Sequence, residues 1–262
     1  MKNLIKDLYV KIFSKKQFYR INNYIINISL KARGYNNYEN SYQSGEKFFL
    51  EKILSKSNPK LCIDIGANKG DYTLDILKNT NATVISFEPL SKCFEVLKNR
   101  TKNFGKRSII VKKGVGIENS SKNIYFDEVN TTHASFLESI KKIPYIKNES
   151  QELVEITTLD EYFKNQPYKE IDFIKIDTEG YEYEVLAGSE STIKNLKPKF
   201  IQIEFNLHQL YQQKTLNYFS EILNRYDVYQ LIPNGWIKIN PRDPISNIYI
   251  YSNFIFVRSS DK

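Results

Sequence analysis

The stretch that decides the fold is residues 60–88, KLCIDIGANKGDYTLDILKNTNATVISFE. It opens with an apolar run, Leu61–Ile65, in which Asp64 is the one charged residue, and such a run is typical of a strand buried on both faces. Gly66 and Gly70 follow and predict a tight loop, because a residue without a Cβ atom adopts positive φ readily and lets the backbone approach a ligand closely.

A helix and a second strand complete this unit. The helical pattern begins at Asp71, and Ala82–Phe87 predicts a strand with Glu88 at its carboxyl end. In a doubly wound sheet, a glycine loop followed by an acid after the next strand binds a nucleoside, and the acid accepts hydrogen bonds from the ribose hydroxyls. The alternative is a β-α-β unit with a purely structural role in some other α/β enzyme.

The loop also indicates which nucleoside is bound. Its spacing is G-x-x-x-G rather than the G-x-G-x-x-G that holds a pyrophosphate, and the chain has no G-x-x-x-x-G-K-[ST] motif. Asp64 at the mouth of the loop would repel a pyrophosphate but attract a cation. S-adenosylmethionine carries an ammonium and a sulfonium and no phosphate, so we expect it to be the cofactor.

The rest of the chain predicts an α/β, doubly wound sheet. Further strands are expected at residues 109–111, 171–176, 200–205, 226–232, 236–239 and 253–257, with shorter candidates at 124–126 and 154–157. Helices are expected at residues 45–54, 91–99, 159–163, 181–187 and 215–223. Parallel strands that alternate with helices and are closed by antiparallel strands give this architecture. Ligands bind beyond the carboxyl ends of such strands, where five acids fall: Asp64, Glu88, Asp177, Glu179 and Glu204.

The composition is that of an ordinary folded protein. Of 262 residues, 41% are apolar and 26% charged, and no apolar stretch is long enough for a membrane span. Residues 1–13 lack the unbroken apolar core of a secretory signal, so a cytoplasmic location is expected. Cys62 and Cys93 are expected to be buried free thiols, and neither has metal-type spacing.

The positive charge is concentrated near the N-terminus. Residues 1–33 contain eight basic residues and one acid, Asp7, and carry +7 of the net charge of +8. The nearly neutral remainder argues against a surface for duplex nucleic acid, so no nucleic-acid partner is expected.

Residues 1–40 therefore predict a basic helical extension and residues 41–262 the cofactor-binding domain, with a linker at residues 34–44. Apolar residues recur at helical spacing at Leu4, Ile5, Leu8, Tyr9, Ile12 and Phe13, between lysines. Such a helix can lie on an anionic membrane or bind an acidic partner. The interpretation that we favour is a terminal helix that packs on its own domain or in a homodimer, with its lysines in solvent.

Two later motifs add a family resemblance. Residues 171–188 read IDFIKIDTEGYEYEVLAG and residues 198–206 read PKFIQIEFN, after IDIGANKG at 63–70 and FEP at 87–89. Over roughly residues 60–206 the chain resembles the FkbM-type S-adenosylmethionine-dependent methyltransferases. The resemblance implies a class I methyltransferase fold, which is Rossmann-like with a mostly parallel seven-stranded sheet. It also implies O-methylation, commonly of a sugar hydroxyl on a glycan or of a natural product.

The resemblance also assigns cofactor contacts by position. It implies that Asp64, Gly66, Asn68 and Gly70 surround the methionine part, that Glu88 binds the ribose and that Asp177 faces the reacting methyl group. The sheet topology places the Gly114-Val115 end of the third strand beside the adenine. The full set predicted to bind the cofactor is Asp64, Gly66, Asn68, Gly70, Tyr72, Glu88, Pro89, Gly114, Val115 and Asp177.

Methyl transfer to an alcohol requires removal of its proton by a base or a metal. Asp177 is the first candidate base; its alternative roles are support of the site and capping of the next helix. Glu204 and His208 are candidates to bind the acceptor or, with Asp177, to hold a divalent ion, although ligands on different strands have no readable spacing. His133 is a further candidate base or an exposed histidine without a role.

Two neighbouring residues are assigned structural roles. Glu179 is expected to cap the next helix or shape the turn. Lys175 is expected to form a buried ion pair with Asp177, because the two side chains lie on the same face of one strand.

Two other functional classes share this fold. A base-modifying nucleic-acid methyltransferase would need a stacking pocket and a basic track, and the chain has no Asn-Pro-Pro-Tyr, Asp-Pro-Pro-Tyr or Pro-Cys element. A binding module without catalysis would have lost cofactor residues, but Asp64, both loop glycines, Glu88 and Asp177 are present. The preferred hypothesis is an O-methyltransferase that acts on a sugar or glycan hydroxyl.

Overall fold

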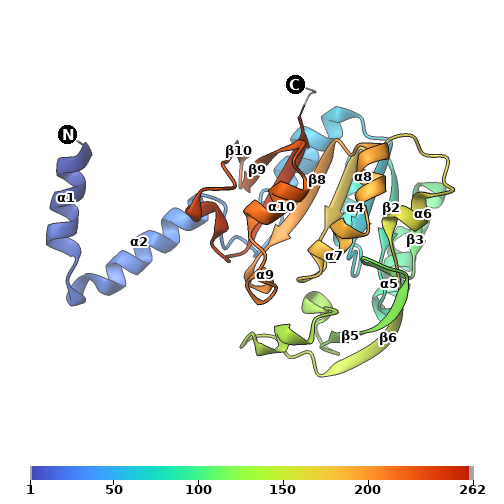
Figure 1. Cartoon of the computed structure of the whole chain (residues 1–262), viewed down its shortest axis with the longest axis horizontal. Helices are drawn as coiled ribbons and strands as arrows, with labels where there is room; N and C mark the ends of the chain where they lie inside the picture. Colours follow the sequence, from blue (N-terminus) through green and yellow to red (C-terminus); the bar gives the residue numbers. More distant parts are fainter. Residues whose placement is uncertain (1, 260–262) are drawn as a thin grey trace.

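The computed structural model describes residues 2–259, with side chains from Leu4 onward. In that part of the chain, eight strands form one sheet, in the spatial order β10 (Gly235–Lys238), β9 (Tyr226–Ile232), β11 (Ser252–Arg258), β8 (Phe200–Phe205), β7 (Phe173–Ile176), β1 (Leu61–Ile65), β2 (Thr83–Phe87) and β3 (Ser108–Val111). Helices cover both faces of this sheet, and two N-terminal helices project away from it (Figure 1).

The predicted doubly wound sheet is confirmed. The five adjacent strands β8, β7, β1, β2 and β3 pair in parallel. The pairs of β11 with β8 and β9, and of β9 with β10, are antiparallel. The sheet has one strand more than the seven that the resemblance implies. The additional strand is β10, which overlaps the strand predicted at residues 236–239 and joins β9 through the turn Pro233-Asn234.

Alternating side chains of β1 explain why both faces of the sheet are covered. Leu61, Ile63 and Ile65 pack into one hydrophobic cluster, and Cys62 packs into a second cluster on the opposite face. The flanking helices and helical turns are α3 (Glu46–Phe48), η2 (Phe49–Leu54), η3 (Ser55–Ser57), α4 (Asp71–Asn79), α5 (Ser91–Thr101), η4 (Lys102–Arg107), α6 (Leu159–Phe163), α7 (Glu182–Ala187), α8 (Glu190–Leu196), α9 (Leu207–Tyr211) and α10 (Leu216–Ile222). The buried residues of η2 and α4 join the second cluster, whereas those of α6, α7 and α10 join the first.

A second, three-stranded sheet lies next to the carboxyl edge of the large sheet (Figure 1). Its strands are β4 (Gly114–Val115), β6 (Ser150–Thr157) and β5 (Ser120–Phe126), in that order. The two short strand candidates are thus confirmed as parts of longer strands that pair with each other. The polar connection between them contains the helical turns η5 (Thr131–His133) and η6 (Glu138–Lys142).

The N-terminal extension consists of α1 (Lys2–Phe13), the turn η1 (Lys16–Phe18) and α2 (Tyr19–Ala32). The side chains of α1 that the structure describes are almost all exposed, and none of the residues of α2 is buried. The prediction that the basic helix packs on its own domain is therefore wrong. None of the helices within residues 2–259 has the length and apolar character needed to cross a bilayer.

Residues 34–44 were predicted to be a linker, but part of this segment packs on the domain. Tyr35 is fully buried, and its hydroxyl donates a hydrogen bond to the carbonyl of Ile245 at 2.8 Å. The backbone amide of Asn36 donates to the carbonyl of Tyr251 at 2.8 Å. The packed part of this segment therefore includes Tyr35, six residues before the predicted boundary at residue 41.

Replacement of Gly66 by alanine is expected to destabilise the fold. Gly66 has φ +83°, and a Cβ atom there would lie 1.8 Å from the carbonyl oxygen of Asp177. Backbone strain and steric overlap together predict a loss of about 3 kcal/mol in the free energy of unfolding, measured by urea denaturation. Gly235→Ala is the matched control, because the nearest atoms to its new Cβ would lie at 3.7 Å. Equal losses in the two variants would contradict this explanation.

Candidate active site

A cavity of about 810 Å³ opens at the carboxyl edge of the parallel strands. This volume lies within the range of roughly 300–1,000 Å³ that is typical of small-molecule and cofactor sites. The predicted site residues that line it are Gly66, Asn68, Glu88, Pro89, Gly114, Val115, His133, Asp177, Glu204 and His208. The topology of the sheet therefore brings together side chains from distant parts of the sequence.

Glu88 is held in place by backbone amides at one end of this cavity. Its carboxylate oxygens accept hydrogen bonds from the amides of Asn68 at 2.7 Å and Leu90 at 2.9 Å. The side chain is buried, and burial raises the pKa of its carboxyl to about 7 despite these two bonds. A carboxylate offers about four lone-pair sites, so two remain for further donors such as a pair of hydroxyls.

The loop before Glu88 is shaped by residues with positive φ. Asn68 has φ +46° and Gly70 has φ +84°. The side chain of Asn68 accepts a hydrogen bond from the hydroxyl of Thr131 at 3.0 Å and so joins this loop to the polar segment before His133. The turn η5 therefore lies beside the glycine loop and lines the cavity.

Three residues of the predicted cofactor set lie outside the cavity lining. Asp64 is fully buried beneath the loop and accepts a hydrogen bond from the hydroxyl of Thr73 at 2.6 Å. A Cβ atom on Gly70 would contact Leu97 in α5, so this position serves helix packing. The resemblance implied direct cofactor contacts at these positions, whereas in the structure Asp64 bonds to α4 and Gly70 packs against α5.

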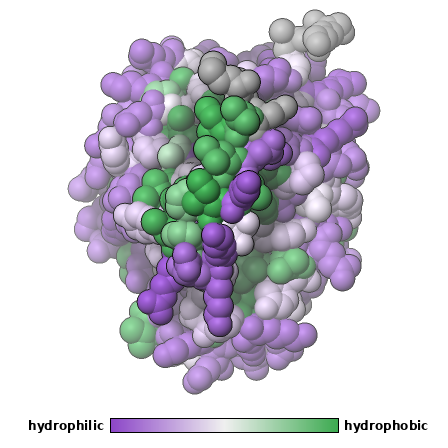
Figure 2. Space-filling model, turned by 90° about the vertical axis from the view of Figure 1, so that its left-hand side faces the viewer, coloured by the Kyte–Doolittle hydropathy of each residue, from purple (hydrophilic) through white to green (hydrophobic). Residues whose placement is uncertain are grey.

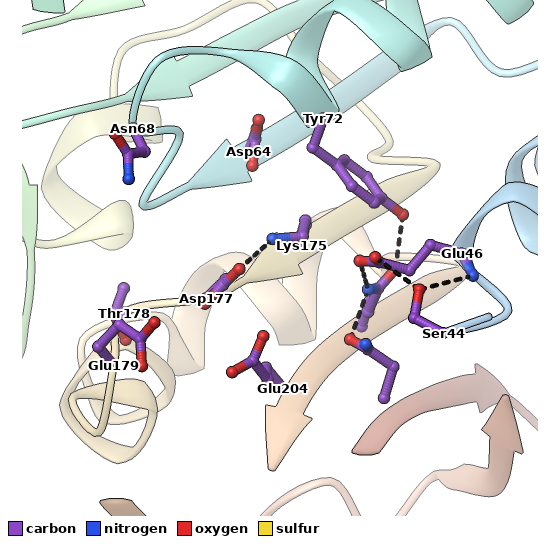
Figure 3. Close-up of polar contacts among 12 residues, drawn as sticks. Ser44, Glu46, Asp64, Asn68, Tyr72, Lys175, Asp177, Thr178, Glu179 and Glu204 are labelled. Carbon is purple, nitrogen blue, oxygen red and sulfur yellow. Dashed lines mark hydrogen bonds and ion pairs between the residues drawn. The ribbon is translucent and has the colours of Figure 1, made fainter. Parts of the chain in front are cut away.

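Tyr72 is the third of these residues, and Figure 3 shows it in a buried polar network. Its hydroxyl donates to Gln202 at 2.6 Å, and Gln202 in turn donates to Glu46 at 2.8 Å. Tyr72 therefore links α4 to β8 and to the start of α3.

Lys175 forms the predicted buried ion pair with Asp177, with 2.5 Å between its Nζ and Oδ2 of the carboxylate (Figure 3). Burial alone would lower the pKa of this ammonium, but the charges of Asp177, Asp64 and Glu46 raise it. Lys175 therefore stays charged and fixes the Asp177 carboxylate at the floor of the cavity.

Glu179 lies between two histidines, although it was predicted to serve as a cap or turn residue. Its Oε1 is 3.4 Å from Nδ1 of His133, and its Oε2 is 3.0 Å from Nδ1 of His208. Burial would raise the pKa of the Glu179 carboxyl, but the contacts with both histidines outweigh it and hold the pKa at about 2. Glu179 therefore lies in the predicted turn, and it also joins the two histidines, a contact that the sequence did not indicate.

Glu182, the first residue of α7, holds the preceding turn in place. Its carboxylate accepts hydrogen bonds from the amides of Thr178 and Gly180 at 2.9 and 3.1 Å. These bonds hold the turn in which Glu179 takes φ +52°, an uncommon conformation for a residue with a side chain. The TEG motif showed that a turn was present, but it did not show which acid would point into the cavity.

Glu204 lies beside this cluster at the end of β8. Burial, together with the nearby charges of Asp177 and Glu179, raises the pKa of its carboxyl well above the ordinary value. It accepts a hydrogen bond from the side chain of Asn206 at 2.7 Å. Two sets of three residues bring ligand atoms within 4.8 Å of one another: His133, Glu179 and His208, and Asp177, Glu179 and Glu204.

Aromatic and polar residues that the sequence did not single out complete the lining. They are Asn36, Tyr38, Tyr145, Tyr249 and Tyr251, and they come from the N-terminal segment, the polar connection and the stretch before β11. Tyr38 and Tyr145 are 64% and 57% exposed, so they present their rings to solvent at the cavity. No local pattern marks these tyrosines, because only the tertiary fold brings the three segments together.

The family model for the methyltransferase FkbM domain matches residues 64–229. The chain belongs to the FkbM methyltransferase family. The predicted family and the class I, Rossmann-like fold are thus confirmed, and the protein is an S-adenosylmethionine-dependent methyltransferase. A comparison with curated proteins finds no match.

Solved structures resemble this FkbM methyltransferase at low sequence identity. An O-methyltransferase from Bacillus cereus in complex with SAH is 12% identical, with a TM-score of 0.49 over 98% of this chain and 97% of that chain. An rRNA methylase from Streptococcus thermophilus is 11% identical, with a TM-score of 0.45 over 82% of this chain and 95% of that chain. SAH-bound PaMTH1 from Podospora anserina is 10% identical, with a TM-score of 0.46 over 82% and 78% of the two chains.

The residues present fit the cofactor of this family. Glu88 keeps acceptor positions free for two ribose hydroxyls, and Gly114 and Val115 give the neighbouring wall a small, partly apolar lining. Asp177 and Glu179 bring carboxylates to the other end, which suits an ammonium and a sulfonium.

Proposed function

We propose that this FkbM methyltransferase transfers a methyl group from S-adenosylmethionine to a hydroxyl of a sugar or glycan. The observation that carries the proposal is that one cavity joins a nucleoside-type end at Glu88 to a cluster of acids and histidines around Glu179. An enzyme for O-methylation needs both features in one cavity, because the acceptor oxygen must approach the donor carbon in line with the bond that breaks.

Bound S-adenosylmethionine supplies an electrophilic methyl group on a positively charged sulfur. Glu88 holds the ribose and the loop at Gly66–Gly70 encloses the donor. Lys175 forms an ion pair with Asp177 and fixes its carboxylate, which would face the cationic end of the donor. The cofactor would supply its methyl carbon to the acceptor oxygen, and its sulfur would keep the electron pair of the broken carbon–sulfur bond.

The proton of the acceptor hydroxyl must leave during this step. The groups around Glu179 are placed to take or stabilise it, because His133, His208 and Glu204 all line the same end of the cavity. His133 is partly exposed, with 34% of its side chain accessible, so it has a route for the proton to solvent.

The character of the cavity supports a sugar acceptor. Four tyrosines from the N-terminal segment, the connection between β5 and β6 and the stretch before β11 line it: Tyr38, Tyr145, Tyr249 and Tyr251. Aromatic rings with polar tips suit a ligand that has both apolar faces and hydroxyl groups. Asn36 and Asn206 add side-chain amides, which can donate hydrogen bonds to hydroxyl groups and accept hydrogen bonds from them.

A screen with methyl-labelled S-adenosylmethionine tests the function. Nucleotide sugars and polysaccharide fragments are the acceptors, and small phenols and RNA are the comparison substrates. We expect label in an acid-stable ether on a sugar, and Asp177→Asn is expected to lower turnover by about 100-fold, as for loss of one electrostatic group at a reacting centre. Affinity for S-adenosylhomocysteine is expected to remain within about threefold, because the nucleoside end is unchanged.

Glu155→Gln on the exposed part of β6 is the matched control, and its turnover is expected to equal that of the wild type. Glu155 pairs with Lys113 at the surface and does not line the cavity. Label that enters only phenols or RNA would contradict the sugar assignment. Unchanged turnover in Asp177→Asn would remove Asp177 from the reaction.

A further inference from the structure

We infer that His133, Glu179 and His208 form a binding site for one divalent transition-metal cation. This site goes beyond the family's cofactor, and it rests on the proposed function only for its role in the reaction. Two imidazoles and one carboxylate come from three separate segments: the turn η5, the loop after β7 and the start of α9. Two histidines and one carboxylate that occupy neighbouring coordination positions of the metal form a ligand set typical of divalent iron and related metals.

Unpartnered atoms point to a missing ligand at this place. His208 is only 1% exposed, and within the described residues neither of its ring nitrogens has a hydrogen-bond partner. Nδ1 of His133 and Oε2 of Glu179 likewise lack an aligned hydrogen bond, although they lie within ion-pair distance of their neighbours. Buried polar atoms without partners are costly, and a cation would satisfy all three residues at once.

The spacing of these atoms also suits a metal. Two ligands that bind at roughly 2.1 Å with angles of about 90–110° lie about 3.0–3.4 Å apart. The two contacts of Glu179 with the imidazoles measure 3.0 and 3.4 Å, and one ligand atom from each residue lies within 4.8 Å of the others.

The second set of acids is a weaker candidate for the same ion. Asp177 is already neutralised by Lys175, and Glu204 is bonded to Asn206. Neither acid has an unpartnered buried oxygen among the described residues. Glu179 is common to both sets, so its partners decide which set binds, and the free imidazole nitrogens favour the histidines.

A cation in this position would act as a Lewis acid on the acceptor. Its open coordination positions would face the cavity, because His133, Glu179 and His208 all line it. A hydroxyl bound to a divalent cation loses its proton more easily, and here the proton passes to solvent while the oxygen lone pair remains for attack on the methyl carbon.

Metal titration of the full chain tests this site. Protein stripped with a chelator is titrated with Co²⁺, whose visible absorption reports nitrogen coordination, and with Mn²⁺ and Zn²⁺ by calorimetry. We expect one site per chain, and Glu179→Gln and His208→Asn are each expected to weaken binding by about 100-fold. Asp177→Asn and Glu204→Gln are the controls, with affinities expected within about threefold of the wild type.

Three results would overturn the inference: no binding of any of these ions, equal binding by Glu179→Gln, or loss of binding in the two controls but not in His208→Asn. Titration with S-adenosylhomocysteine in the same samples separates this inference from the proposed function. A chain that binds the nucleoside but no metal keeps its methyltransferase assignment and loses the metal site, and His133 oriented by Glu179 would then be the base.

A second, independent observation concerns the N-terminal arm, defined as α1 and α2. Many of its apolar side chains face solvent, including Leu4 at 73%, Ile5 at 67%, Leu8 at 56% and Tyr24 at 67% exposure. Figure 2 views the molecule from the side on which the arm projects, and a band of hydrophobic residues runs between hydrophilic ones. An exposed apolar band of this size marks a contact surface.

The structure assigns this surface to an anionic lipid bilayer. Residues 1–33 carry a charge of +7, so a second copy of the arm would bring like charge to the same place. An amphipathic helix with lysines beside an apolar face instead suits the headgroup region of an anionic membrane. Aromatic rings pack on one another at the bend between α1 and α2. The ring centroids of Tyr9 and Phe13 are 4.7 Å apart, and those of Phe13 and Phe18 are 5.0 Å apart.

Vesicle sedimentation with the full chain tests the arm. We expect at least about tenfold stronger partitioning into phosphatidylglycerol-containing vesicles than into pure phosphatidylcholine, because basic residues near the surface are attracted to anionic headgroups. The double variant Ile5→Asp, Leu8→Asp is expected to lose this binding. The matched control is Leu153→Asp, Ile237→Asp, which changes two exposed apolar residues outside the arm and is expected to bind like the wild type.

Equal partitioning into neutral and anionic vesicles, or none into either, would overturn the assignment. A dimer in sedimentation equilibrium that disappears in the Ile5→Asp, Leu8→Asp variant, without vesicle binding by the wild type, would assign the apolar band to a second copy instead.

Discussion

The interaction on which the site depends is the buried ion pair between Lys175 and Asp177. Parallel strands end at one edge of the sheet, and that edge therefore gathers Asp64, Asp177 and Glu204 in a small volume. An uncompensated buried charge costs several kcal/mol, so such a group of acids needs a cation inside the protein. Lys175, which is only 5% exposed and lies in the central strand β7, supplies it. The electrostatics of the fold and of the cavity are thus set by one ammonium.

Each carboxyl group around the cavity is stabilised by a different kind of partner, and that partner decides what the group can bind. Backbone amides hold Glu88, an ammonium holds Asp177 and imidazoles hold Glu179. Amide donors leave lone pairs free for neutral hydroxyls, an ion pair keeps a fixed negative charge, and imidazoles can exchange protons or bind a cation. One cavity thereby combines acceptors for hydroxyl groups, a fixed carboxylate and a cluster that can exchange protons or bind a cation.

Much of this could be predicted from sequence, where local patterns determine the result. The run Leu61–Ile65, the glycine loop and Glu88 predicted the first β-α-β unit correctly, because burial and turn formation depend on neighbouring residues. The direction of individual side chains could not be predicted. Asp64 and Tyr72 point into the protein interior, whereas Glu179 points into the cavity. These directions depend on packing between segments that are far apart in sequence. The position of the tyrosines in the cavity likewise depends on tertiary contacts between distant segments. The exposure of the arm depends on the absence of such contacts.

The central claim is that the cavity holds an adenosyl group whose ribose is bound by Glu88. Calorimetric titration with S-adenosylhomocysteine, wild type against Glu88→Ala, tests it most directly. Loss of two hydrogen bonds to a charged group amounts to about 3 kcal/mol or more, so micromolar binding by the wild type should weaken by at least about 100-fold in the variant. Wild-type affinity retained in Glu88→Ala would contradict the account, because the nucleoside would then lie elsewhere.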